Sequence, residues 1–236
     1  MRLHRFIGEY NLNKDIIEIK DLDFIKQIKS VLRLELGDFL ILCDGNGIEA
    51  KVEIIEINKG EIITQVIERT EKEQDLKKVS LYLSILKKEN FELAVEKAVE
   101  IGVSEIIPII TERTIKLNLN EDRLRKIIRE ASEQSGRVYL PKLSPIMKFE
   151  DAILDGKKNE ENIFFDIVDI KETVRGSFAS AHSNSASIFI GPEGGFTEEE
   201  NNFAKENNYE IQSLGKLTLR AETAAIIATY KVVNNL

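Results

Sequence analysis

The hydrophobic positions of the chain follow two different patterns, one up to residue 74 and one from residue 75 onward. The first region holds short apolar or alternating runs separated by tight glycine turns, as closely spaced β-strands do. The expected strands cover residues 16–19, 39–42, 50–55 and 61–67. One helix is expected from Phe24 to Leu32, and its inner side is expected to carry Phe24, Ile25, Ile28, Val31 and Leu32. This spacing predicts a small β-barrel over residues 1–74.

A charged linker with few apolar residues, 71–78, ends this region, and we place the domain boundary there. Strands and helices then alternate over residues 75–236, which is typical of a mainly parallel sheet with helices on both faces. The expected strands are 79–86, 106–110, 163–165, 187–190 and 210–214, and the expected helices are 91–101, 123–135, 149–154, 171–181, 198–207 and 221–233. Gly102 and Gly136 are natural residues to end two of these helices.

Two glycine-containing loops connect a strand to a helix in the second region. Gly191-Pro192-Glu193-Gly194-Gly195 follows a buried strand, and Thr197 with Glu200 forms a capping box that marks the next helix. Residues 214–220 repeat the strand, glycine, helix order. Loops with few side chains before a helix N-terminus let a ligand reach backbone N–H groups. We therefore expect both loops to surround a small molecule. The alternative is that each is only a tight turn, which is the usual role of a glycine turn before a helix.

Composition narrows the class of protein. The 236 residues are 42% hydrophobic and 31% charged, as in a soluble globular protein. A single cysteine, Cys43, and two histidines without ligand spacing exclude a disulfide framework and the usual zinc sites. No apolar run approaches about 20 residues and the amino terminus lacks an export signal, so we expect a cytoplasmic protein without a membrane span. Neither a P-loop nor a Gly-x-Gly-x-x-Gly motif is present.

The charge of the chain does not decide whether the protein binds nucleic acid. The net charge of −8 argues mildly against bulk attraction to nucleic acid. Between Arg113 and Lys142, however, eight Lys and Arg residues stand against four acidic residues. This stretch is either a local basic face for RNA or an ordinary solvated helix face.

Five blocks, in order along nearly the whole chain, resemble the RsmE family of the SPOUT superfamily. The most specific are Gly191-Pro192-Glu193-Gly194-Gly195-Phe196 and Leu214-Gly215 with Leu219-Arg220-Ala221-Glu222-Thr223-Ala224. The others are 96–103, 130–137, and Arg5-Phe6 together with 31–38. The family methylates N3 of a uridine in small-subunit ribosomal RNA. Ile101, 216–218 and Ala221 depart mildly from its usual residues, which leaves the side-chain contacts of the second loop open.

The resemblance implies a fold, a cofactor and a partner. The fold is an α/β, SPOUT-type parallel-sheet domain with a C-terminal trefoil knot, residues 75–236, preceded by a PUA-like β-barrel for RNA binding, residues 1–74. The cofactor is S-adenosylmethionine, the substrate is 16S ribosomal RNA of the small subunit, and the protein acts as a homodimer whose sites are completed by the partner chain; no metal is implied. The implied cofactor-binding residues are Phe165, Ile190, Gly191, Pro192, Glu193, Gly194, Gly195, Leu214, Gly215, Leu217 and Leu219.

The chemistry of methyl transfer suggests roles for further residues. Cations near O2 and O4 would stabilise the uridine anion, and Arg220 and Arg137 are our candidates, with phosphate contact an equal alternative for Arg137. Gln134 could hydrogen-bond the base edge. Glu222 and Glu193 are candidate bases, or acidic anchors of their loops. The RNA backbone would meet Arg2, Arg5, Lys29, Arg33, Arg123, Arg125 and Arg129.

Three other functions stay open at this point. A SPOUT methyltransferase could act on a different base or atom, for example in transfer RNA. An assembly factor could keep the fold without turnover, in which case cofactor binding would be lost. An unrelated nucleotide-binding enzyme is the third, but the phosphate motifs are absent.

Overall fold

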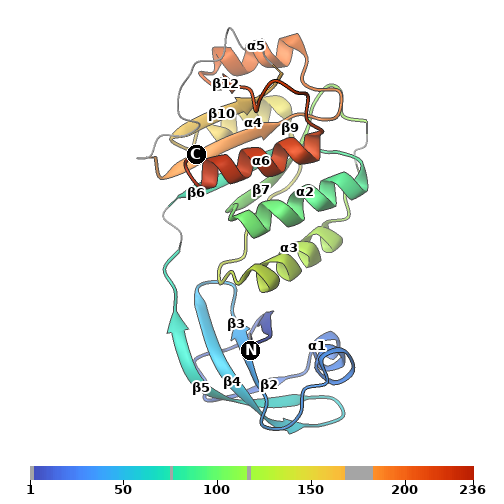
Figure 1. Cartoon of the computed structure of the whole chain (residues 1–236), viewed down its shortest axis with the longest axis vertical. Coiled ribbons are helices and arrows are strands. Elements are labelled where there is room, and N and C mark those ends of the chain that lie inside the picture. The colour runs from blue at the N-terminus through green and yellow to red at the C-terminus, as the bar shows by residue number, and fades with distance from the viewer. Residues whose placement is uncertain (1–2, 75–76, 116–117, 168–182) are drawn as a thin grey trace. The chain divides into compact units, whose positions relative to one another are not determined.

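The computed structural model describes residues 3–74, 77–115, 118–167 and 183–236 (Figure 1). The chain divides into two compact units. The first contains Met1–Gln74 and Ser132–Leu140, and the second contains Asp75–Ala131 and Pro141–Leu236. No helix of the described ranges is long and apolar enough to cross a membrane.

A five-stranded sheet forms the first unit, in the order β1-β3-β4-β5-β2. Its strands are β1 (Arg5–Ile7), β2 (Ile16–Ile19), β3 (Phe39–Cys43), β4 (Ile48–Ile57) and β5 (Ile62–Glu71). Neighbours pair antiparallel, except that β1 is parallel to β3. Alternate residues such as Leu40, Leu42, Val52 and Ile54 are fully buried, which is the pattern expected of strands with one face on a core.

The helical segment of this unit differs from the prediction of one helix over 24–32. An α-helix, α1 (Leu22–Lys26), passes directly into a π-helix, η1 (Gln27–Leu32). The Asp21 carboxylate caps the start by accepting from the N–H groups of Asp23 and Phe24. Arg33, with φ of 54°, closes the end in the left-handed region. Of the residues expected on the inner side, Phe24, Ile25 and Ile28 are buried, and Leu32 is partly buried against the same core. The prediction for Val31 was wrong, because it is 68% exposed.

Residues 132–140 belong with the first unit, although the sequence prediction placed them in the second domain. The Glu133 carboxylate accepts from the Ile7 N–H at 2.8 Å, and the Tyr139 hydroxyl donates to the Lys72 carbonyl at 3.0 Å. The Leu140 N–H also donates to the Gly45 carbonyl at 3.0 Å. These bonds span large sequence separations, so local patterns could not reveal them.

The second unit is built on a seven-stranded sheet in which every pair is parallel. Its path is β12-β10-β11-β6-β7-β8, and β9 also pairs with β7. The strands are β6 (Lys78–Ser84), β7 (Glu105–Ile110), β8 (Lys142–Leu143), β9 (Met147–Lys148), β10 (Glu161–Phe165), β11 (Ser185–Ile190) and β12 (Glu210–Gln212). Because the strands are parallel, their carboxyl ends share one edge of the sheet, where ligands bind in open α/β folds.

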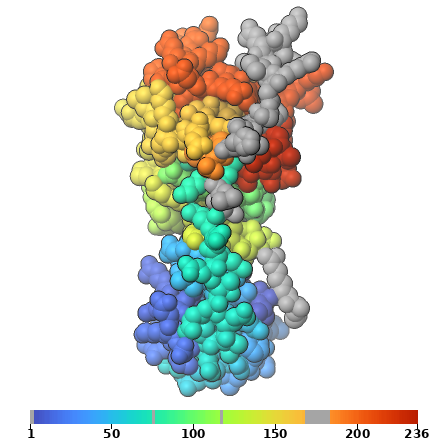
Figure 2. All heavy atoms as spheres, turned by 90° about the vertical axis from the view of Figure 1, so that its left-hand side faces the viewer, coloured from blue at the N-terminus to red at the C-terminus, as the bar shows by residue number. Residues whose placement is uncertain are grey.

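Helices cover both faces of this sheet. The helices are α2 (Lys88–Ile101), α3 (Glu121–Ser135), α4 (Phe149–Gly156), α5 (Glu198–Glu206) and α6 (Ala221–Val233). Helices α2, α3 and α6 pack on the face that carries Leu81, Leu83 and Ile188, whereas α4 and α5 pack on the face of Tyr82 and Phe189 (Figure 1). Both α5 and α6 reach the molecular surface in Figure 2, in orange and red. The predicted α/β class with a parallel sheet is therefore confirmed.

Local end signals were read correctly. Gly102 and Gly136 have positive φ values of 125° and 87°, and Thr197 with Glu200 forms the predicted capping box. Strands β1, β8 and β9 were not predicted, since two or three residues carry no periodic signal. The helix expected over 171–181 lies outside the described residues. The connection from β10 to β11 includes 168–182, so the trefoil knot stays a prediction.

Candidate cofactor site

A cavity of about 830 Å³ opens at the carboxyl ends of β10, β11 and β12, beside the start of α6. Its volume lies within the range of ordinary cofactor pockets, roughly 300–1,000 Å³. All the predicted cofactor residues except Gly194 line it: Phe165, Ile190, Gly191, Pro192, Glu193, Gly195, Leu214, Gly215, Leu217 and Leu219. The fold thus brings together two loops that are separated in sequence by α5 and β12.

The first loop is a tight turn with fixed backbone angles. The Gly195 N–H donates to the Pro192 carbonyl at 2.9 Å, and the φ of Gly195 is 69°, which an L side chain rarely adopts. A Cβ at Gly191 would lie 3.0 Å from the Phe196 ring. Glu193 is an anchor of this loop, because its carboxylate accepts from the Lys87 N–H at 3.1 Å. The carboxylate thereby joins the loop to the segment that leads into α2.

Residues 213–219 of the second loop all line the cavity. The Ser213 hydroxyl donates to the Gly215 carbonyl at 3.0 Å, and Gly215 has a φ of 146°. A Cβ added at Gly215 would meet nothing within 4 Å, so this backbone faces open space. Leu217 is 82% exposed although it lines the cavity.

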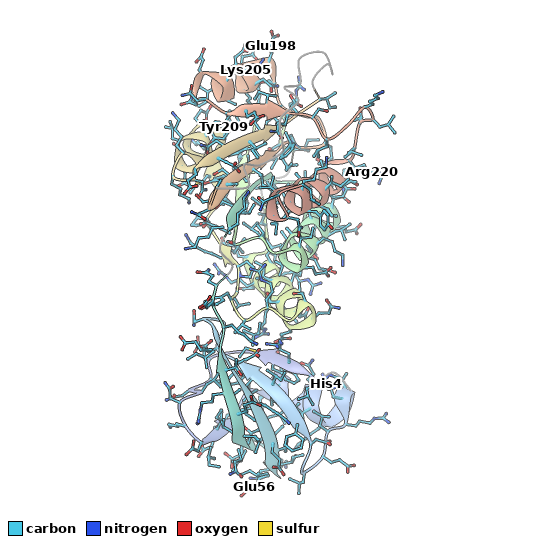
Figure 3. All side chains as sticks on the ribbon, turned by 60° about the vertical axis from the view of Figure 1, so that its left-hand side comes forward. His4, Glu56, Glu198, Lys205, Tyr209 and Arg220 are labelled. Atoms are coloured by element: carbon cyan, nitrogen blue, oxygen red, sulfur yellow. The ribbon has the colours of Figure 1, made fainter. Side chains whose placement is uncertain are left out.

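Arg220 and Glu222 stand at the start of α6 and both line the cavity. The side chain of Arg220 is 85% exposed, and Figure 3 shows it on the outside of the domain. Glu222 is buried, and its Oε2 atom has no hydrogen-bond partner among the described residues. The nearest nitrogen of Arg220 lies 4.0 Å from the other oxygen, Oε1. An exposed cation and a buried carboxylate thus both line this cavity.

The sequence analysis did not predict how Arg113 and Glu200 connect the first loop to the turn after β7. Arg113 Nη1 donates to the carbonyls of Gly194 at 2.7 Å and Phe196 at 3.1 Å. The buried Glu200 carboxylate accepts from the Glu112 N–H at 2.9 Å as well as from its own helix cap. Arg113 was noted only as one member of a basic stretch. No sequence signal links it to a loop 81 positions away.

Comparison with known proteins decides the family. Residues 72–233 match the family described as RNA methyltransferase domain, and residues 28–67 match the RNA methyltransferase PUA domain. The ribosomal RNA small subunit methyltransferase E of Rickettsia conorii is 32% identical over 92% of this chain and 88% of its own length. This chain belongs to the ribosomal RNA small subunit methyltransferase E family. The sequence resemblance is thereby confirmed, together with the expected PUA domain.

Solved structures agree with this family. The methyltransferase E of Neisseria gonorrhoeae, bound to S-adenosylmethionine, is 27% identical with a TM-score of 0.83, covering 97% of this chain and 95% of that one. A methyltransferase from Legionella pneumophila, in complex with the same cofactor, is 27% identical with a TM-score of 0.82, covering 97% and 96%. Both similarities extend over nearly the whole chain.

Gln134 and Arg137, which the chemistry of methyl transfer suggested as contacts to the base, do not line the cavity of this chain. Gln134 is exposed near the end of α3, and Arg137 follows it, donating from Nε to the Tyr139 carbonyl at 3.3 Å. Both belong to the segment 132–140 and so to the first compact unit. Within one chain, the structure groups Arg220 and Glu222 at the site and leaves Gln134 and Arg137 outside it.

The predicted RNA-contacting residues differ in their surroundings. Arg2 lies outside the described residues. Arg5 requires a correction, because its side chain is only 14% exposed and its Nη1 lies 2.6 Å from the Glu49 carboxylate, so its charge is already compensated. Lys29, Arg33, Arg123 and Arg125 are exposed, and Arg129 is half-buried. Within the described ranges, no three His, Cys, Asp or Glu side chains are grouped to hold a metal ion.

Proposed function

We propose that this protein transfers a methyl group from S-adenosylmethionine to N3 of a uridine in 16S ribosomal RNA. The observation that carries the proposal is the cavity formed by residues 191–195 and 213–219 in a chain of the methyltransferase E family. The cavity suits such a cofactor because glycine backbone lines it and Gly215 faces open space. The cofactor supplies a methyl group on a sulfonium, which is a strong electrophile.

The residues of the chain orient the base and manage its proton. As the new N3–C bond forms, the S–CH₃ bond breaks and its electron pair stays on sulfur, so positioning in line is essential. Glu222 is our candidate to accept the N3 proton, because its Oε2 lacks a partner among the described residues. Arg220 stabilises the negative charge that develops on O2 and O4. Its exposure at the cavity mouth leaves it accessible to RNA.

Gln134 and Arg137 would complete the site from a second copy of the chain. We propose a homodimer in which Gln134 binds the base edge and Arg137 contacts the base or its phosphate. A second hollow, of about 460 Å³, supports the dimer. It is lined by Lys97, Glu100 and Ile101 of α2, by Ile226, Ile227, Tyr230 and Lys231 of α6, and by Leu236 beyond the end of α6. Tyr230 is 51% and Leu236 is 58% exposed, and a partner chain seated on this hollow would cover them.

The two domains would divide the work. Residues 1–74 would bind RNA, with Lys29 and Arg33 exposed on that unit, and residues 75–236 would bind the cofactor and carry out the transfer. Arg123, Arg125 and Arg129 of α3 would meet the RNA backbone. A ribosomal substrate would place the protein in the cytoplasm.

Cofactor binding can be tested with a matched pair of glycine variants. Gly195→Ala puts a side chain at a φ of 69°, whereas Gly60→Ala lies in the first unit with nothing within 4 Å of the added Cβ. We expect calorimetry to show S-adenosylmethionine binding by the wild type and by Gly60→Ala. We expect binding by Gly195→Ala to be at least about tenfold weaker, since the strained turn distorts the loop. A wild-type protein that binds no cofactor would overturn the proposal and favour an assembly role.

A further inference from the structure

The turn that follows β7 is fastened to the first glycine loop. Residues 111–114 form this turn, in which the Thr111 N–H donates to the Thr114 hydroxyl oxygen at 2.9 Å. From it, Arg113 Nη1 reaches two carbonyls of the loop, at 2.7 Å to Gly194 and 3.1 Å to Phe196. One guanidinium nitrogen therefore holds two peptide units that are two residues apart.

Both of these peptide units are also held at their other end. The Gly194–Gly195 unit donates its N–H to the Pro192 carbonyl at 2.9 Å. The Phe196–Thr197 unit donates its N–H to the Glu200 carboxylate at 2.9 Å. A peptide group is planar, so fixing its oxygen and its N–H fixes the orientation of the whole unit. The loop backbone at the cavity is thereby held in one shape before any ligand arrives.

Glu200 ties the same two segments together from the other side. Its second oxygen accepts from the Glu112 N–H at 2.9 Å, and the residue is only 8% exposed. The turn and the loop are thus joined by three hydrogen bonds, two from Arg113 and one through Glu200. The two bonds from Arg113 are charge-assisted, because the donor is a charged guanidinium, and such bonds are stronger than those between two neutral groups.

We propose that Arg113 is a positioning residue that fixes the cofactor loop in its binding shape. Arg113 does not line the cavity, so it would act through the backbone of residues 191–196 rather than by touching the ligand. Without it, the loop would have to be ordered at the moment of binding, which lowers affinity. The inference rests on the proposed cofactor, but it concerns a residue outside the site itself.

The test compares Arg113→Ala with a matched arginine of the first unit. Arg69 also donates to a backbone carbonyl, from Nε to Leu12 at 2.7 Å, but it holds a segment far along the chain from the cavity loops. Calorimetry with S-adenosylmethionine and with its demethylated product should show an affinity about tenfold weaker for Arg113→Ala. Arg69→Ala should bind both as the wild type does. Arg113→Lys keeps a charged donor and should recover part of the lost affinity.

Hydrogen exchange gives a readout that does not depend on the cofactor. In Arg113→Ala without ligand, the amides of residues 194–197 should exchange faster than in the wild type, while those of β11 stay unchanged. If Arg113→Ala loses its fold, Arg113→Lys carries both measurements. Wild-type affinity together with wild-type exchange in a folded Arg113→Ala would overturn the inference. A wild-type protein without cofactor affinity would instead refute the proposed function.

Discussion

Arg220 and Glu222 are two residues apart at the start of α6, yet one side chain is 85% exposed and the other 8%. Position along a helix explains the contrast. Arg220 is the N-cap residue and its backbone is still extended, with φ of −66° and ψ of 152°, whereas Glu222 lies in the first turn, where the helix packs on the sheet. The helix N-terminus also favours a negative charge at that place. One short segment thus presents an exposed cation to solvent and a buried carboxylate to the cavity.

Arg220→Ala should lower the turnover rate and leave cofactor affinity nearly unchanged. If Arg220 stabilises the charge that develops on the uridine oxygens, its loss should reduce kcat by about 100-fold. Single-turnover methylation and calorimetry measure the two quantities separately. Arg220→Lys keeps the charge and should lose less. Methylation at the wild-type rate by Arg220→Ala would refute this role.

The variant Glu222→Gln should show whether Glu222 removes the N3 proton or only binds and anchors the loop. Glutamine has nearly the same shape and can still accept hydrogen bonds, but it cannot take a proton. We expect kcat to fall by about 100-fold while cofactor affinity stays within about twofold. If affinity collapses while kcat is preserved at saturating cofactor, Glu222 binds or anchors and the base lies elsewhere.

Two inactive variants should restore each other if the site is shared between subunits. Arg220→Ala and Arg137→Ala place their defects on opposite sides of such a site. A mixed dimer then has one site with both defects and one site with none, so random exchange should recover about a quarter of wild-type activity. Assays before and after co-refolding of the two variants measure this recovery. The absence of any recovery from verified mixed dimers would contradict the shared site.

Glu105 should make the second unit sensitive to acid. Burial alone would raise the pKa of its carboxyl, but hydrogen bonds from Ser144, Lys142 and Lys158, at 2.6, 2.9 and 3.2 Å, outweigh burial and lower the pKa to about 2. A carboxyl with a lowered folded-state pKa stabilises the fold above its ordinary pKa of 4.5, and this stability is lost as the pH falls toward 2.

The matched pair for this prediction is Glu105→Gln and Glu210→Gln. Glu210 is exposed on the edge strand β12. At pH 7 Glu105→Gln should be less stable than the wild type by about 1–2 kcal/mol, a figure reduced for solvent screening of the two lysines. The difference in urea denaturation should shrink as the pH is lowered from 5 to 2.5. A constant difference across this range would show that Glu105 stabilises the unit through packing rather than charge.

The sequence predicted the helix ends that depend on neighbouring residues, but it did not predict the contacts between residues far apart in the chain. Gly102, Gly136 and the Thr197–Glu200 pair act within one helical turn, so the sequence alone located those ends correctly. The Arg113 contact to Gly194 spans 81 residues and depends on β7 and β11 lying in one sheet, which no spacing reveals. For the same reason the sequence did not reveal that residues 132–140 contact the first compact unit.

The candidate site shows the same division. A glycine loop between a strand and a helix is visible in sequence, and both such loops line the cavity. Gln134 and Arg137 were proposed from the chemistry of methyl transfer, and within one chain these residues lie in the other unit. Arg5 was predicted from its charge, but the pairing with Glu49 appears only when β1, β3 and β4 come together.

The most direct test of the central claim is methyl transfer to small ribosomal subunits that lack this modification. The protein would be incubated with tritium-labelled S-adenosylmethionine and the subunits, and the labelled nucleoside would then be identified after digestion of the RNA. We predict label in N3-methyluridine at a single position of the 16S RNA, and none with Arg220→Ala on the same time scale. Label in a different nucleoside, or no label from a protein that binds the cofactor, would contradict the account.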